Sequence, residues 1–292
     1  MVKINKEIIA KKKVSKKTKR SNGVLDRISS IGFDEDEGIK MLVYGRSGTG
    51  KTTLWATFPK PILAIICSGS TRSPDELRSI DTKEYRKSIN QVTLQNSSEL
   101  QEVIDYQQSE TAYRTVVIDH ATGLYDLILK GILGIDEIPA QASWGMASQQ
   151  QYGQCVLQFK QLMRGLLSLS SNVVVVAQER VFEVPEGSED LGLNPTIGAA
   201  LSPSASSWLN TACSYICRTY IQQKTTTKIL KIGGKEMEKQ VKSKGIDYCL
   251  HTAPHEIFTT KFRIPRVDGV SLPERILNPN YNKILNLIQQ GE

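Results

Sequence analysis

The 292-residue sequence contains no long hydrophobic run. Its densest apolar stretch, Asn172–Ala177, holds four valines and has the length of a buried strand, whereas a membrane-spanning helix needs about 20 apolar residues. A transmembrane protein and a membrane partner are therefore not expected. The N-terminus is rich in lysine and no apolar block follows it, so we do not expect a secretory signal.

Cysteine is also scarce. The chain has five cysteines, an odd number without CxxC spacing, which are Cys67, Cys155, Cys213, Cys217 and Cys249. This pattern argues against a disulfide framework and a zinc cluster, and it predicts reduced, buried thiols in a cytoplasmic protein. With 39% apolar and 23% charged residues the composition is globular.

The formal net charge of +7 is concentrated at one end. Residues 1–20 contain nine lysines and arginines against Glu7, whereas residues 21–292 carry 28 basic and 29 acidic side chains. We expect residues 1–22 to form a disordered basic tail. A solubilising tail, an electrostatic tether to nucleic acid and a nuclear-import-like signal all fit this composition.

The next part of the chain alternates between strands and helices. Short unalternating apolar runs predict strands, and helical periods separate them. We expect strands at 40–44, 61–67, 91–94, 115–118 and 173–177, and helices at 24–31, 51–58, 98–108, 123–133 and 148–169. The alternation predicts an α/β protein whose mainly parallel sheet is covered on both faces.

The last third has a different pattern. Antiparallel strands are expected at 214–222, 225–232, 237–242, 246–250 and 256–263, followed by a helix at 281–290. Gly233-Gly234 is typical of a hairpin turn. We therefore expect one domain over 23–292, with a nucleotide-binding core at 38–180 and an extension of loop, β-hairpin and helix at 181–292.

One motif indicates chemistry clearly. Gly45-Arg46-Ser47-Gly48-Thr49-Gly50-Lys51-Thr52, followed by Thr53, matches GxxxxGK[ST] between an apolar strand and a helix. Glycines let the backbone wrap around phosphates, so its N–H groups and the helix N-terminus face them. Lys51 is expected to reach the β- and γ-phosphates and the Thr52 hydroxyl to ligate Mg²⁺.

An acidic residue completes this expectation. Asp119 ends the apolar strand Thr115–Ile118, and strand ends of this kind face the nucleotide crevice of an open α/β sheet. We expect Asp119 to hold Mg²⁺ through water. No NKxD motif for guanine is present, so the expected nucleotide is ATP.

These features resemble the RecA-like ATPases, and more closely the phage-encoded RecA-like proteins of the single-strand-annealing (Sak) type. The resemblance lies in Gly50-Lys51-Thr52-Thr53-Leu54, in Phe58-Pro59-Lys60-Pro61 before a buried strand, and in Gln178-Glu179 after strand 173–177. It implies that Gln178, or else Glu179, senses the γ-phosphate. It also implies a cytoplasmic location in a bacterial host.

The same resemblance implies self-association. In RecA-like filaments basic residues of a late strand reach the ATP of a neighbouring subunit, and Lys261 and Arg263 occupy the matching place here. Alternation puts both on one strand face, where they could instead simply be solvated. One departure is that no acid follows the strand ending at Cys67, because Glu76 fits a capping box. Hydrolysis is therefore expected to be slow, or to recruit Glu179 or another base.

The resemblance places DNA-binding loops at about 134–151 and 180–204. Trp144 in the first loop and Tyr152 at its end could stack on bases or belong to the core, and the second loop is acidic. Between Lys224 and Lys244 the predicted hairpin has seven lysines against Glu236 and Glu238. These lysines fit either phosphate binding or protection of a sheet edge from aggregation.

The sequence thus predicts an oligomeric ATPase that acts on single-stranded DNA in phage recombination or annealing, with a single-strand DNA-binding protein as a further partner. An assembly or switch ATPase acting on protein partners is the alternative. A small-molecule kinase is disfavoured, since no arginine-rich lid follows the phosphate motif.

Overall fold

The computed structural model describes residues 38–67, 88–136, 147–183, 195–232, 235–264 and 271–289, with the backbone alone for 225–243. All described residues belong to one compact unit. The predicted basic tail, the helix at 24–31 and the capping box at Ser73–Glu76 lie outside these ranges.

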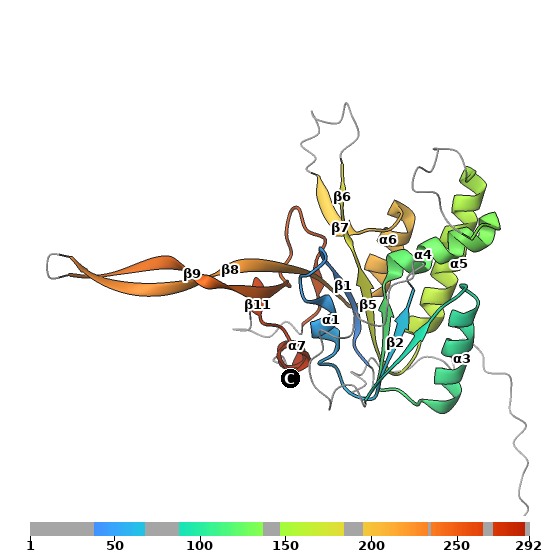
Figure 1. The fold of residues 1–292 in the computed structure, drawn as a ribbon, viewed down its shortest axis with the longest axis horizontal. Helices are drawn as coiled ribbons and strands as arrows, with labels where there is room; N and C mark the ends of the chain where they lie inside the picture. The colour runs from blue at the N-terminus through green and yellow to red at the C-terminus, as the bar shows by residue number, and fades with distance from the viewer. Residues whose placement is uncertain are drawn as a thin grey trace, which may run out of the picture. The chain divides into compact units, whose positions relative to one another are not determined.

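Strands and helices alternate through the first two thirds of the described chain (Figure 1). In chain order the elements are β1 (Lys40–Tyr44), α1 (Lys51–Trp55), β2 (Ile62–Ile66), β3 (Ile89–Thr93), α3 (Glu99–Glu110), β4 (Thr115–Asp119), α4 (Ala121–Leu133), α5 (Gln149–Leu167), β5 (Asn172–Ala177), β6 (Glu179–Phe182), β7 (Thr196–Ala199), α6 (Pro203–Ala212), β8 (Tyr215–Ile232), β9 (Lys235–His251), β10 (Lys261–Phe262), β11 (Arg275–Leu277) and α7 (Tyr281–Gln289).

The described strands form a nine-stranded sheet in the order β11–β9–β8–β1–β5–β4–β2–β3, with β10 also paired to β8. All pairs from β8 to β3 are parallel, and the pairs that β9, β10 and β11 make are antiparallel. The prediction of a mainly parallel α/β sheet with an antiparallel C-terminal portion is confirmed. Strand β5 lies between β1 and β4, so the phosphate motif and Asp119 are one strand apart.

Both faces of the sheet are buried, which explains why its central strands are apolar without alternation. Val116 and Val117 are adjacent in β4, are both fully buried, and belong to opposite hydrophobic clusters. One cluster contains side chains of α3, α4, α5 and α6, and the other contains side chains of α1 and α7. Burial of each large aliphatic side chain contributes about 1.5–3 kcal/mol to folding.

Helix α1 is shorter than predicted. It was expected to reach Phe58 but ends at Trp55, and the next amides, of Thr57 and Phe58, bond three residues back in a tightened turn. Two local causes act together. The Thr57 hydroxyl donates to the Leu54 carbonyl at 2.7 Å and so competes for it, and Pro59 disfavours helical geometry in the residue before it.

The C-terminal strands also differ from expectation. The predicted breaks within the hairpin are absent, since β8 and β9 each run continuously through 18 and 17 residues, with only a register shift between Gln223 and Thr225. Ile232 pairs with Lys235, as a turn at 233–234 requires, although the two glycines lie outside the described residues. The strand expected at 256–263 was wrong in extent, because only Lys261–Phe262 pairs with β8, besides a bridge at Phe258.

Among the described helices, none is both long and apolar enough to cross a bilayer.

Candidate nucleotide-binding site

The phosphate loop connects β1 to α1 and is shaped by its glycines. Gly48 and Gly50 have φ angles of +78° and +87°, in the left-handed region that glycine adopts without strain. The Thr49 hydroxyl closes the turn by donating to the Arg46 carbonyl at 2.7 Å. These contacts hold the loop in a tight curve at the carboxyl edge of the parallel strands.

The Lys51 side chain lies across this curve. Its Nζ donates to the carbonyls of Gly45 and Arg46, each at 2.7 Å. Burial lowers the pKa of Lys51, whereas the nearby carboxylates of Asp119 and Glu179 raise it. The amine is thus partly desolvated, held by two carbonyls of its own loop, and near two negative charges.

Asp119 ends β4 and contacts a residue that the sequence did not single out. Trp55, the last residue of α1, is fully buried, and its indole N–H donates to Oδ2 of Asp119 at 3.2 Å. The helix that follows the phosphate loop therefore also orients the carboxylate one strand away. A tryptophan normally indicates packing alone, and so this contact could not be predicted from the sequence.

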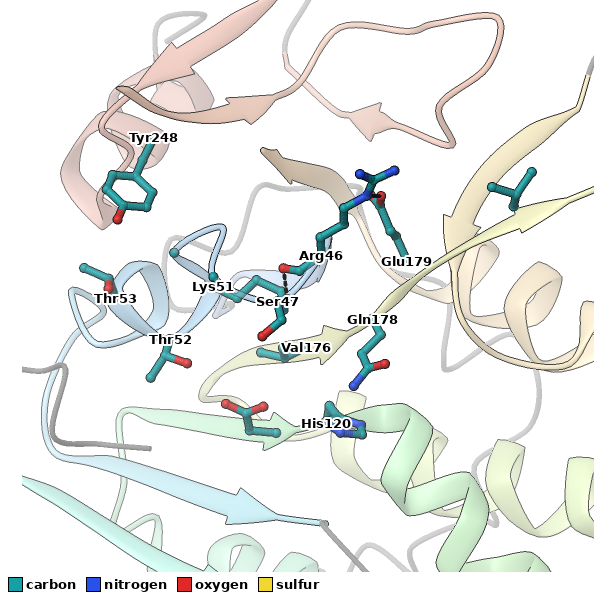
Figure 2. Close-up of a pocket in the computed structure, with 14 residues that line it drawn as sticks. Arg46, Ser47, Lys51, Thr52, Thr53, His120, Val176, Gln178, Glu179 and Tyr248 are labelled. Atoms are coloured by element: carbon teal, nitrogen blue, oxygen red, sulfur yellow. Dashed lines mark hydrogen bonds and ion pairs between the residues drawn. The ribbon is translucent and has the colours of Figure 1, made fainter. Parts of the chain in front are cut away.

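A cavity of about 740 Å³ brings most of the predicted residues together (Figure 2). Its lining includes Lys51, Asp119 and Gln178, and also the following predicted residues: Arg46, Ser47, Gly48, Gly50, Thr52, Thr53 and Glu179. Gly45 and Thr49 belong to the loop without lining the cavity. Four lining residues were not in the predicted set, namely His120, Val176, Val181 and Tyr248.

His120 has a structural partner. Its Nδ1 accepts a hydrogen bond from the Gly123 amide at 2.9 Å and caps the N-terminus of α4. A neutral ring with Nδ1 as acceptor carries its proton on Nε2.

The two residues after β5 are in different environments. Figure 2 shows the Gln178 side chain extending into the cavity near His120, with Glu179 lying toward Arg46. Both carboxylate oxygens of Glu179 are bonded, to Arg46 Nε at 2.8 Å and to Arg218 Nε at 3.0 Å. Of the pair, Gln178 is the better placed to meet a terminal phosphate, while Glu179 would have to leave two arginines to act as a base.

Arg218 could not be predicted from the sequence, because its ion pair with Glu179 depends on which strands are neighbours in the sheet. It lies on β8 opposite Tyr44 of β1, and its guanidinium stacks over the Phe258 ring at 4.2 Å. Its side chain is only 14% exposed, so Glu179 is the counter-charge of a largely buried cation.

Lys261 and Arg263 do not reach the cavity of their own chain. Lys261 Nζ donates to the carbonyls of Asn210 and Thr211 at the C-terminal end of α6, where a cation also complements the helix dipole. Arg263 is exposed just beyond β10. A role for either residue in a neighbouring subunit stays a prediction.

Two residues of the hairpin strands press on the phosphate loop. A Cβ at Gly50 would lie 3.0 Å from the Tyr248 ring, and Tyr248 is 44% exposed at the cavity mouth. The hydroxyls of Thr49 and Thr219 hydrogen-bond at 2.7 Å. Only the register of β8 and β9 against β1 reveals these contacts.

Comparison with known proteins agrees with this geometry. A family model described as an AAA domain matches residues 37–264, which includes the phosphate loop, Asp119 and the strand that ends before Gln178. A search of the curated proteins finds no match to the chain. The match covers most of the sequence, and the chain belongs to the AAA-domain family of P-loop ATPases.

Proposed function

We propose that this protein binds and hydrolyses ATP with Mg²⁺, and that single-stranded DNA is the partner on which it acts, in phage recombination or strand annealing. The observation that carries the ATPase function is the shared cavity of Lys51, Thr52, Asp119 and Gln178. The DNA function is supported by the Sak-type resemblance and by the seven lysines between Lys224 and Lys244.

The donor groups fit Mg²⁺ and a triphosphate. Hydroxyl and carboxylate oxygens, here from Thr52 and Asp119, are the ligands that Mg²⁺ prefers, with water and phosphate oxygens for its other positions. Among the described residues, no group of three or more His, Cys, Asp and Glu could hold a metal by itself. A metal that arrives with its nucleotide suits this limited set of protein ligands.

The chain's own groups would act by position and charge. The left-handed glycines would let loop amides face the phosphates, and Lys51 would exchange its two carbonyl partners for phosphate oxygens. Mg²⁺, held by Thr52 and Asp119, would neutralise charge on the phosphoryl group. The Gln178 amide would donate a hydrogen bond to the terminal phosphate, and the Trp55 indole would keep Asp119 oriented.

Tyr248 is the proposed platform for the base. It lies at the cavity mouth beside Gly50, and Figure 2 shows its ring near Thr53 at the start of α1, on the side away from Gln178. A triphosphate whose terminal group faces Gln178 would bring its base toward this ring. A stacked aromatic ring accepts any base, so the choice of adenine rests on the missing NKxD motif.

Self-association is part of the proposal. Arg263 is exposed and available to a neighbouring active site, where a cation would neutralise transition-state charge. Lys261 already holds the end of α6, which makes Arg263 the better trans-acting candidate. A single-strand DNA-binding protein is a further proposed partner.

The test is ATP turnover with and without single-stranded DNA. Wild-type protein should show DNA-stimulated turnover, Lys51→Ala should abolish turnover, and Lys130→Ala, a lysine at the end of α4, should behave as wild type. Turnover that ignores DNA but responds to a protein partner would replace the DNA function with the assembly or switch function. Turnover that survives in Lys51→Ala would refute the site itself.

A further inference from the structure

The β8–β9 hairpin extends far beyond the sheet from which it starts (Figure 1). The last residue of β8 that pairs with β1 is Arg218, and the last of β9 that pairs with β11, toward the tip, is Cys249. From Ile221 to Ile232 the strand would measure roughly 40 Å at about 3.3 Å per residue. We call residues 221–232 and 235–248 the ribbon.

No third strand among the described residues pairs with the ribbon. An isolated two-stranded hairpin is only marginally stable in water, so an element of this length is suited to binding a partner. Its composition indicates which one. Between Lys224 and Lys244 the seven lysines exceed the two glutamates by five charges, while the chain from 21 to 292 is nearly neutral.

Apolar side chains at the base of the ribbon are also exposed. Ile221 pairs with Tyr248, and Ile246 lies two residues from Tyr248 on the same face. Their exposed fractions are 48% for Ile221 and 58% for Ile246. Lysines next to exposed apolar surface are suited to binding single-stranded nucleic acid, which offers both phosphates and unpaired bases. A duplex would offer mainly phosphates.

Where the ribbon joins the sheet, three interactions link β8 and β9 to the phosphate loop. On β8, Thr219 bonds to Thr49, and Arg218 shares Glu179 with Arg46. On β9, Tyr248 packs on Gly50. A shift of either strand would therefore move residues of the phosphate loop.

We infer that the ribbon is the surface that binds single-stranded nucleic acid, and that the three interactions where it joins the sheet couple this binding to nucleotide binding. The inference rests on the proposed function and gives it a location. The loops after β4 and β5, which the resemblance implies as the DNA-binding elements, are then not the main ones. Coupling is reciprocal, so the strand and the nucleotide raise each other's affinity by the same factor.

The binding test uses the full chain and a fluorescein-labelled oligothymidylate, with fluorescence anisotropy read across a salt series. Lys228 and Lys239 pair across the ribbon, and both are changed in Lys228→Gln/Lys239→Gln. The matched control is Lys130→Gln/Lys160→Gln, which removes the same charge from α4 and α5. Each lost phosphate contact lowers the salt slope by about 0.7, so the ribbon variant should lose roughly 1 to 1.5 in slope. The control should keep the wild-type slope.

The coupling test uses Thr219→Val, which keeps the side-chain shape but removes the hydroxyl that bonds Thr49. In wild type the oligonucleotide should raise affinity for a fluorescent ATP analogue about fivefold or more. In the variant this factor should fall toward one, while oligonucleotide affinity without nucleotide stays at the wild-type value. An unchanged factor would overturn the coupling.

The outcomes separate this inference from the proposed function. If wild-type protein neither binds the oligonucleotide nor responds to it in turnover, the DNA function fails and the inference fails with it. If wild type binds and responds but the ribbon variant matches its control, only the inference fails. A ribbon variant that changes the sedimentation mass, without changing oligonucleotide affinity, would make the ribbon a contact between copies and overturn the inference.

Discussion

The hydrogen bond from Trp55 to Asp119 leads to a quantitative prediction. Trp55→Phe removes the indole N–H while an aromatic ring remains in the fully buried position. The Asp119 carboxylate then keeps its place at the end of β4 but loses the donor on Oδ2. The nearest effect is expected on Mg²⁺, since this carboxylate is the one proposed to hold the ion.

The magnitude follows from the kind of hydrogen bond. A hydrogen bond to a charged group contributes about 1.5–3 kcal/mol, and removing an outer partner of a metal-binding group typically costs 10–100-fold in metal affinity. We expect the half-saturating Mg²⁺ concentration to rise by about 10–100-fold. Nucleotide binding without Mg²⁺ should stay unchanged, because the phosphate loop contacts remain.

The assay is titration of Mg²⁺ into protein with a fluorescent ATP analogue, with Trp208→Phe as the control. Trp208 lies on α6 and packs only partly buried against the other hydrophobic cluster. Both variants lose one indole, so both are expected to melt at lower temperature than wild type. If Trp55→Phe melts at a lower temperature yet shows the Mg²⁺ dependence of the control, Trp55 acts by packing alone and does not orient Asp119.

Three further predictions concern other parts of the structure. Tyr248→Ala should weaken binding of ATP about fivefold or more, because a stacking interaction of about 1–3 kcal/mol is lost. Tyr248→Phe should bind ATP as wild type does, and both variants should bind inorganic triphosphate equally. Wild-type ATP affinity in Tyr248→Ala would exclude the platform. Lys261→Ala should lower the free energy of unfolding, measured in urea, by about 0.5–1.5 kcal/mol, because the hydrogen bonds to the end of α6 are lost, while turnover per folded molecule is retained. Arg263→Ala should keep the stability and lower turnover. The reverse pattern would make Lys261 the trans-acting residue. Burial raises the pKa of the Cys213 thiol to about 12, above its value in the unfolded chain of about 8.5. The contribution of this thiol to stability should therefore be full below pH about 8.5 and decline as the pH rises toward about 12. Urea titrations should show a shallower alkaline decline in stability for Cys213→Ala than for wild type, and an equal decline would contradict the assignment.

The parts of the fold that follow local patterns could be predicted from the sequence. β1 has the predicted bounds, and α5 and α7 end within two residues of expectation. The phosphate loop and Asp119 were found because their motif and strand context are contiguous. Buried parallel strands and long amphipathic helices produce the same short-range signals wherever they occur.

The remaining features depend on long-range pairing. Thr219 and Tyr248 meet the phosphate loop because β8 lies beside β1 and β9 pairs with β8, and no local pattern encodes that order. The continuity of the hairpin was missed because Gly245 and the polar residues near it are typical of a break, whereas the structure accommodates them in a register shift. Lys261 was assigned by resemblance to a catalytic position, but the end of α6 lies within its reach.

The placement of β5 has a consequence for how the nucleotide cavity tolerates change. Val176 pairs with Val43 on one side and with Asp119 on the other, so it forms the part of the cavity wall between the phosphate loop and Asp119. The distance across this wall from β1 to β4 is two strand spacings of about 4.8 Å each, and the backbone hydrogen bonds of the sheet maintain it. Truncating a polar side chain of the cavity leaves the spacing of these strands unchanged. A bulkier residue at 176 would instead fill the space beside Asp119 and displace the ion without altering any of its ligands.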